Sequence, residues 1–146
     1  MEFKITINAP REKVWNALWD DASYREWTSA FAEGSWADTD WKKGSKALFL
    51  GEKNSGMVST IAENIPNEFM SIKHLGNVID GVEDLESEEA KKWAGGFENY
   101  TLRTVDGKTE LKIDMGGVDI SQEFKDYFMD AWPKALQKLK ELAEKK

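Results

Sequence analysis

The single histidine of the chain, His74, is the residue best suited to proton transfer near neutral pH. It ends an alternating run through Met70 and Ile72, and we expect all three on the interior face of one strand. His74 either meets a ligand or acts as a general base there, or it is a structural residue satisfied by backbone or a carboxylate. Because no second acid or base accompanies it at a recognisable spacing, the structural interpretation is favoured. Since the chain also has no cysteine, we expect no metal site and no cofactor.

Two hydroxyl residues are the next candidates for polar groups in the interior. Tyr100 shares the parity of Leu102 on one expected strand, and Ser59 shares that of Met57 on another. A buried hydroxyl can orient a ligand in an apolar cavity. The alternative for Tyr100 is a hydroxyl that reaches solvent or the loop around Trp93. The alternative for Ser59 is a small residue that only fills space.

Seven tryptophans and seven phenylalanines in 146 residues indicate either a very aromatic core or an aromatic pocket. Trp15 and Trp19 lie on one helical stripe, so we expect them to pack the closed end of the fold. The other rings and several apolar neighbours are expected to line a cavity or its rim, although those on the last helix also serve the core. With the polar candidates, the expected cavity residues are Trp27, Phe31, Trp36, Trp41, Phe49, Met57, Ser59, Ile72, His74, Trp93, Tyr100, Leu102, Phe124, Phe128 and Trp132.

The elements that position these residues are predicted from hydrophobic periodicity. A strand over residues 1–8 is followed by a helix that opens at Pro10 and by a second helix over about 23–30. Six strands follow, at 34–38, 45–50, 57–64, 68–74, 97–105 and 109–115. The least regular stretch lies between residues 74 and 97, and there Ser87 is expected to begin one or two helical turns.

The last predicted element is a long helix from Ser121 to about Glu144. Ser121 is a good N-cap residue. A continuous apolar stripe along the helix consists of Phe124, Phe128, Trp132, Leu136 and Leu139. Pro133 lies inside it, and because the stripe keeps its phase across the proline, we expect one bent helix. This is the only element large enough to cover the apolar face of an antiparallel sheet.

The length predicts a single domain over residues 1–146, and the lack of a membrane span or signal-peptide pattern favours the cytoplasm. The net charge of −7 disfavours nucleic acid and anionic lipid as partners. No apolar run approaches the ~20 residues of a membrane span, and the N-terminus alternates where a signal peptide would be continuously apolar. The acidic stretch from Asp80 to Glu89 is either a solvated loop or a docking surface for a basic protein partner.

This order of elements, β-α-α-β6-α, resembles the helix-grip fold of the START-like superfamily, which birch-pollen-allergen-type proteins and polyketide cyclases share. Several local motifs are similar to those of homologues of the activator of the heat-shock-protein-90 ATPase. They are residues 9–18 (APREKVWNAL), Trp27, Gly44-Ser45, residues 97–102 (FENYTL) and residues 132–140 (WPKALQKLK). The resemblance covers essentially the whole chain. It implies an α+β fold in which a curved antiparallel sheet of about seven strands wraps around the C-terminal helix.

Three functions follow from this resemblance. The first is binding of a small hydrophobic or aromatic ligand, such as a lipid, in a cavity between the sheet and the C-terminal helix, with His74 and Tyr100 orienting it. The second is an enzyme of the polyketide cyclase or aromatase type, in which one of these two residues moves protons. The third is a co-chaperone-like protein-interaction module that uses the acidic stretch. We expect a binding protein rather than an enzyme.

Overall fold

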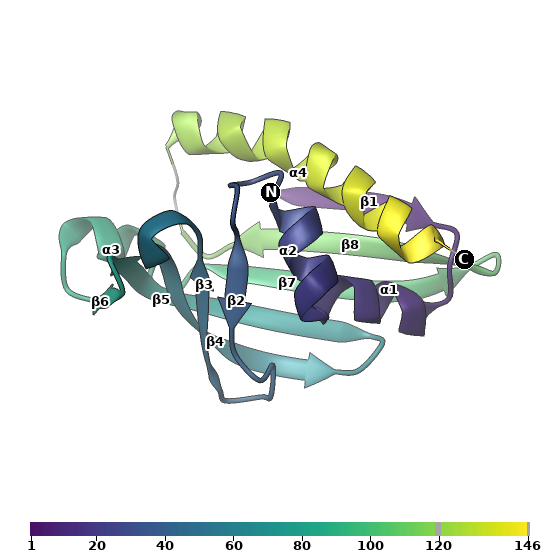
Figure 1. Ribbon diagram of the computed structural model, residues 1–146, viewed down its shortest axis with the longest axis horizontal. Coiled ribbons are helices and arrows are strands. Elements are labelled where there is room, and N and C mark those ends of the chain that lie inside the picture. The colour runs from purple at the N-terminus through teal and green to yellow at the C-terminus, as the bar shows by residue number, and fades with distance from the viewer. Residues whose placement is uncertain (119–120, 146) are drawn as a thin grey trace.

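In the computed structural model, which describes residues 1–118 and 121–145, a curved sheet is flanked by helices (Figure 1). The strands are β1 (Glu2–Ile7), β2 (Trp36–Asp38), β3 (Lys46–Leu50), β4 (Gly56–Ile65), β5 (Phe69–Ile79), β6 (Val82–Asp84), β7 (Phe97–Val105) and β8 (Lys108–Gly116). The helices are α1 (Arg11–Trp19), α2 (Asp21–Thr28), α3 (Glu88–Trp93) and α4 (Gln122–Glu144), with a short 3-10 turn, η1 (Glu52–Asn54). The predicted α+β helix-grip architecture is therefore confirmed.

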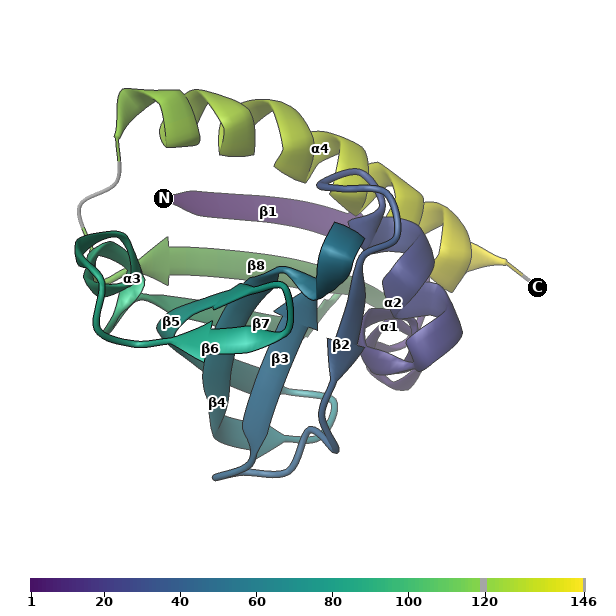
Figure 2. The ribbon, with the colours of Figure 1, turned by 60° about the vertical axis from the view of Figure 1, so that its left-hand side comes forward.

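The sheet runs in the order β1-β8-β7-β5-β4-β3-β2, with β6 added beside β5, and every pairing is antiparallel. Its concave face is set by simple alternation, since Met70, Ile72 and His74 of β5 and Tyr100 and Leu102 of β7 are all buried. Aliphatic side chains of β8 continue this face and meet α1, α2 and α4 in the main core. Figure 2 shows α4 running along the length of the sheet, from the end near α3 to the end near α1.

Helix α4 is continuous, as predicted, with Pro133 inside it and Ser121 as its N-cap. Its apolar stripe is buried over only part of its length, from Ala131 onward. Phe124 and Met129 are 45% and 59% exposed. The expectation that Phe124 serves the core is wrong, because the ring that it meets is that of Trp93 at the end of α3, which is itself only half-buried. We call residues 122–130 the roof segment. No described helix is long and apolar enough to cross a membrane.

The stretch between residues 74 and 97 is more regular than expected. β5 continues to Ile79 and turns back into β6, so the predicted end of the strand at His74 is wrong. The reversal is made by Asp80 and Gly81, whose φ angles are 50° and 81°. Two consecutive positive φ angles are typical of the type I′ turns that close two-residue hairpins. The expected helical turns are present as α3, which Ser87 caps.

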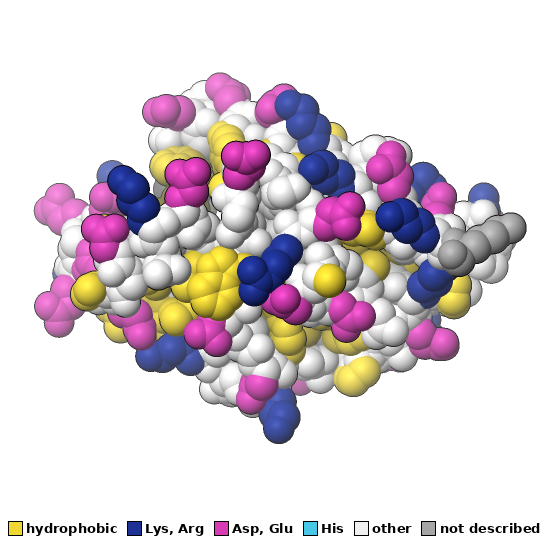
Figure 3. All heavy atoms as spheres, viewed as in Figure 1, with side chains coloured by type: hydrophobic (Ala, Val, Ile, Leu, Met, Phe, Trp, Pro, Cys, Tyr) yellow, Lys and Arg dark blue, Asp and Glu magenta, His cyan; other side chains and the backbone are white. Residues whose placement is uncertain are grey.

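The end of the molecule built by β6 and α3 carries much of the acidic charge, and Figure 3 shows acidic side chains gathered there. Glu86, Glu88 and Glu89 are exposed. Glu83 is bound by Lys46 of β3, with 2.9 Å between Nζ and Oε2. Asp84 is used locally, because its carboxylate accepts hydrogen bonds from the backbone N–H groups of residues 86 and 87. The acidic stretch is thus a structured hairpin and helix with an exposed charged face.

Candidate functional site

A cavity of about 370 Å³ lies between α2, the strands β2 to β5 and α4. Its walls are mostly aromatic. The rings that line it are those of Trp19, Tyr24, Trp27, Phe31, Trp36, Phe49, Tyr100, Tyr127, Phe128 and Trp132. Such a volume suits a small organic molecule, and flat apolar walls with few polar groups are typical of ligand pockets. We call this space the main cavity.

A second space of about 260 Å³, the side cavity, lies toward α3 and the beginning of α4. Its own lining includes Trp93, Phe97, Met115 and Lys125. The two cavities have four lining residues in common, namely Met57, His74, Glu98 and Phe128. These residues therefore form the partition between the two spaces, and the polar groups of the site lie on it.

The polar groups at the partition and next to it come from three neighbouring strands. Ser59 of β4 lies directly opposite His74 of β5, and its Oγ is 2.7 Å from the histidine Nδ1. Glu98 of β7 pairs with Ile72, two residues before His74, so it is the diagonal neighbour of the histidine. The histidine Nε2 is 3.1 Å from Glu98 Oε1, and the hydroxyl of Tyr100 donates to Glu98 Oε2 at 2.8 Å. We call these four residues, Ser59, His74, Glu98 and Tyr100, the polar row.

The electrostatics of the row centre on Glu98. Burial alone would raise the pKa of this carboxyl, but the hydrogen bond and charge of His74 and the hydrogen bond from Tyr100 outweigh it and lower the pKa. Glu98 is therefore a carboxylate at neutral pH. Burial, reinforced by the Glu98 charge, raises the pKa values of Tyr24 and Tyr100 beyond their ordinary range, so both stay protonated donors.

The row has proton-transfer groups but no accessible nucleophile. Ser59 is fully buried behind His74 and does not line either cavity. Although serine, histidine and glutamate follow one another as in a hydrolase triad, the hydroxyl cannot reach a bound molecule. His74 and Glu98 do line both cavities, so the arrangement can orient a ligand or shuttle a proton.

The aromatic walls are held by contacts behind them. The indole N–H of Trp27 donates to the carbonyl of Leu18 at 3.1 Å. The ring of Trp19 meets Tyr100 edge to face, with 4.9 Å between centroids, and Trp132 meets Phe31 in the same way at 4.8 Å. The indole nitrogens of Trp19 and Trp132 are buried and find no hydrogen-bond acceptor among the described residues.

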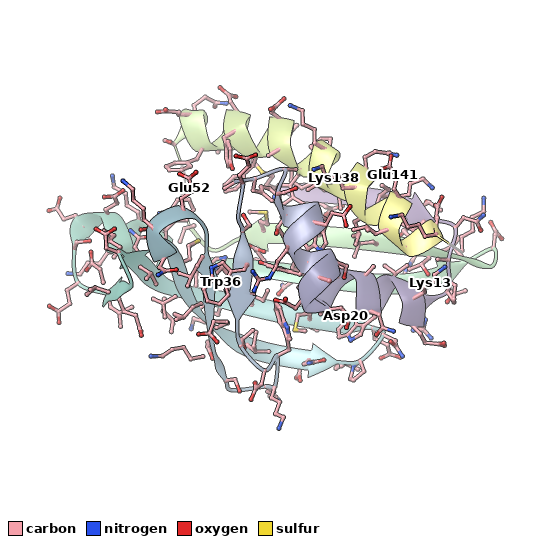
Figure 4. All side chains as sticks on the ribbon, in the orientation of Figure 1. Lys13, Asp20, Trp36, Glu52, Lys138 and Glu141 are labelled. Atoms are coloured by element: carbon pink, nitrogen blue, oxygen red, sulfur yellow. The ribbon has the colours of Figure 1, made fainter. Side chains whose placement is uncertain are left out.

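The rim of the main cavity joins the segment after α2 to α4. The hydroxyl of Tyr127 donates to the carbonyl of Phe31. Farther along α4, Lys138, which does not line the cavity, binds Ser29 with 2.9 Å between Nζ and Oγ. Across the rim, Figure 4 shows Trp36 on β2 and Glu52 on η1, and both line the cavity.

Comparisons with known proteins agree with this geometry. The family model described as Activator of Hsp90 ATPase homolog 1-like protein matches residues 8–144. The chain belongs to this family. The family and the START-like, helix-grip resemblance predicted from the sequence are thereby confirmed. A sequence search of curated proteins gave no match.

Solved structures with the same fold include several at low sequence identity. A protein from Mesorhizobium loti has a TM-score of 0.76 and 17% identity, covering 97% of this chain and 94% of that one. The Aha1 dimer from Colwellia psychrerythraea has a TM-score of 0.72 and 20% identity, covering 99% and 95%. CalU16 from Micromonospora echinospora has a TM-score of 0.64 and 16% identity, covering 98% and 74%. At these identities the likeness concerns the fold alone.

Within this member of the family, most residues expected around a cavity do surround one. Those that line the main cavity are Trp27, Phe31, Trp36, Phe49, Met57, Ile72, His74, Tyr100, Phe128 and Trp132. Trp93 lines the side cavity. Tyr100 turns its hydroxyl to Glu98, neither to solvent nor to the Trp93 loop. Contact of these residues with a ligand stays a prediction.

Four expected cavity residues lie elsewhere. Trp41 packs behind the wall on Trp19, with 4.7 Å between ring centroids, because its backbone turns with a φ of 63° away from the rim. Leu102 is in the core beyond Tyr100, and Ser59 stands behind His74. Phe124 lies outside the cavity, where it meets Trp93 edge to face.

Sequence reasoning missed several residues of the site, among them Trp19, Tyr24, Glu52, Glu98 and Tyr127. Glu98 has the parity of Tyr100 and Leu102, so the period of two would have placed it on the interior face. Trp19 was assigned to packing alone, yet it also lines the main cavity. Tyr24 precedes Trp27 by three residues on one helical stripe, so the helical period could have placed it beside Trp27 and Phe31.

Proposed function

We propose that this protein binds a small hydrophobic or aromatic molecule in the main cavity. The observation that carries the proposal is an aromatic cavity of about 370 Å³ with a buried polar row in its wall. Ring faces supply apolar burial, and burying about 200 Å² of ligand surface contributes about 5 kcal/mol before the cost of association. His74, Glu98 and Tyr100 supply the few polar groups that orient a ligand.

We propose that the cavity opens at its rim, where the segment after α2 meets α4. The segment after α2 is tied to α4 by Tyr127 and Lys138, and both side chains are anchored by single hydrogen bonds at exposed positions. Exposed hydrogen bonds of this kind contribute little free energy. A ligand therefore enters between the segment after α2 and the roof segment, while the sheet stays intact.

The proposal is tested by extraction and by titration. Protein purified under non-denaturing conditions is denatured, and the released small molecules are identified by mass spectrometry. In parallel, a library of lipids and polyaromatic compounds is screened by NMR for shifts of cavity side chains. We expect a released compound or a saturable hit. If denaturation releases nothing and no library member shifts a cavity resonance, the proposal is wrong.

A second candidate function, proton-transfer catalysis of the cyclase or aromatase type, is favoured by one observation. It needs two titratable groups inside the cavity, and His74 and Glu98 meet this need at 3.1 Å. The test compares His74→Gln with the natural protein on any compound that the screen finds. Unchanged binding with loss of product formation supports catalysis, whereas no product from the natural protein contradicts it.

The third candidate, a protein-interaction module, rests on the exposed acidic face of the hairpin and α3. A basic partner would bind there by charge complementarity. Reversal of Glu86, Glu88 and Glu89 to lysine would then abolish capture of the partner in a pulldown. Binding that withstands both this reversal and high salt would contradict a role for the acidic stretch.

A further inference from the structure

Carboxylates are the predominant charged groups in the lining of the main cavity. Its lining includes the carboxylates Glu52 and Glu98, and among the described residues no lysine or arginine lines it. Arg25 lies near the rim, with its guanidinium 5.5 Å from the centroid of the Trp36 ring, but it does not line the cavity. The side cavity differs, because Lys125 lines it. A molecule in the main cavity therefore experiences a negative potential on apolar walls.

The Glu98 carboxylate has acceptor capacity to spare. Each of its oxygens receives one hydrogen bond, from His74 and from Tyr100. A carboxylate offers about four acceptor positions, so further donors can be accepted. Among the described residues no lysine or arginine forms an ion pair with it. The carboxylate is kept ionised by its hydrogen bonds, so an ammonium group from outside can form the ion pair with it that these side chains do not.

The hydrogen bonds of His74 are complete when its ring is neutral. Ser59 is fully buried, and the contact of its hydroxyl among the described side chains is with His74 Nδ1. When that nitrogen accepts the Ser59 proton, Nε2–H donates to Glu98, and every donor of the pair has an acceptor. A protonated ring would leave the Ser59 proton in need of another partner. With a neutral ring the negative charge of Glu98 is free to pair with a ligand, and an ammonium group bound there takes the place of the positive charge that a protonated His74 would supply.

The rings beside Glu98 add a second attraction for a cation. The negative face of an aromatic ring attracts an ammonium group, most strongly for tryptophan and when water is excluded. Trp19 and Trp132 both contact Tyr100, the neighbour of Glu98 on β7, with centroids 4.9 Å and 6.2 Å away. Tyr24 is also close enough for the Glu98 charge to act on its hydroxyl.

We propose that the main cavity selects an organic cation, namely an amine on a hydrophobic or aromatic body, with its ammonium group bound to Glu98 among the tryptophan rings. This inference rests on the proposed function and names the chemical class of its ligand. The acidic surface, with a net charge of −7, also favours the approach of a cation.

The test uses three probes that share a phenylbutyl group and differ in the head group. They are 4-phenylbutylamine, 4-phenylbutanol and 4-phenylbutanoate. Dissociation constants are measured by calorimetry at neutral pH and constant ionic strength. We expect the amine to bind at least about tenfold more tightly than the alcohol, and the carboxylate most weakly. Glu98→Gln should reduce the ratio of amine to alcohol to about one, because it removes the charge and keeps the shape.

Control variants distinguish the effect of the Glu98 charge from the effect of the net charge of the protein. Glu86→Gln removes one negative charge from the exposed stretch and should keep the amine preference. The near-UV circular dichroism of Glu98→Gln, compared with that of the natural protein, shows whether this variant is folded. Binding of all three probes without preference overturns the inference and leaves the proposed function intact. A preference that survives Glu98→Gln in a folded protein also overturns it. If neither the probes nor the library compounds bind, both the inference and the proposed function are wrong.

Discussion

The sheet wall and the helical roof of the main cavity are built in different ways. In the wall, the polar row is buried, and strand pairing fixes each member against the next. In the roof segment, only Phe128 is partly buried, while Tyr127 and Met129 are 43% and 59% exposed. The wall is thus organised before any ligand arrives, and the roof is held by few contacts.

Because of this difference, the wall can orient a ligand while the roof controls its entry into the cavity. Polar groups that position a ligand work best on rigid elements with complete hydrogen bonding, which the wall provides. Regions with few buried contacts open at a lower free energy than the core, and the roof segment has this character. The chain can therefore expose its cavity without disturbing the groups that recognise the ligand.

The largest difference in the free energy of unfolding is expected between substitutions of two methionines, one in the wall and one in the roof. Met70 of β5 is fully buried beneath the wall, opposite Tyr100, whereas Met129 of the roof is 59% exposed. Met70→Ala should lower the free energy of unfolding by about 2–5 kcal/mol, because it leaves a cavity in the core. Met129→Ala should change it by less than about 0.5 kcal/mol. Urea denaturation of both variants checks this, and equal losses would show that wall and roof are equally packed.

A smaller effect is expected from Glu98→Gln and should depend on pH. The pKa of Glu98 is lowered by folding, so the carboxylate stabilises the protein above its unfolded pKa of about 4.3. That stability is lost as the pH falls through the folded pKa. The variant should be about 1.5–3 kcal/mol less stable at pH 7, since hydrogen bonds to a charged group are weakened. Thermal unfolding should show this gap closing toward acid. A gap that is constant with pH would mean that Glu98 is not a charged member of the polar row.

A smaller loss of stability than that of Met70→Ala or Glu98→Gln is expected from a change at the rim. Tyr127→Phe removes the hydrogen bond to the Phe31 carbonyl and leaves the ring in place. The loss should be about 0.5–1 kcal/mol, and it should be confined to the opening of the roof segment. Hydrogen exchange should then be faster by about two- to fivefold in α4 before Ala131 and unchanged in β5 and β7. Faster exchange throughout the sheet would show that roof and wall open together.

The fold was predictable because its signals are local. Alternation placed the long strands, and the phase of the α4 stripe correctly indicated one helix through Pro133. The β5–β6 hairpin was missed because Asp80-Gly81, a turn signal, lies inside a run of charge. The exposure of Phe124 could not be predicted, since a stripe shows which face is apolar and not whether an element covers it.

Single residues of the site could be predicted from the sequence, but the contacts between them could not. His74 and Tyr100 could be placed on an interior face by parity alone. Their meeting at Glu98 depends on the register of β5 against β7 and on the irregularity in β4 next to Ser59, which a single sequence does not reveal. Trp41 lies behind the wall because its backbone has a positive φ angle, and tryptophan rarely adopts such an angle. This position could therefore not be expected from the sequence.

The most direct test of a ligand in the main cavity is the NMR signal of the seven tryptophan indole groups, each assigned by a Trp→Phe variant. The spectrum is followed during titration with 4-phenylbutylamine and with any compound found by extraction. We predict saturable shifts for the indoles that line the main cavity, Trp19, Trp27, Trp36 and Trp132, while Trp15 stays unchanged. Equal shifts for Trp15 and the lining indoles, or no shift in any of them, would contradict binding in this cavity.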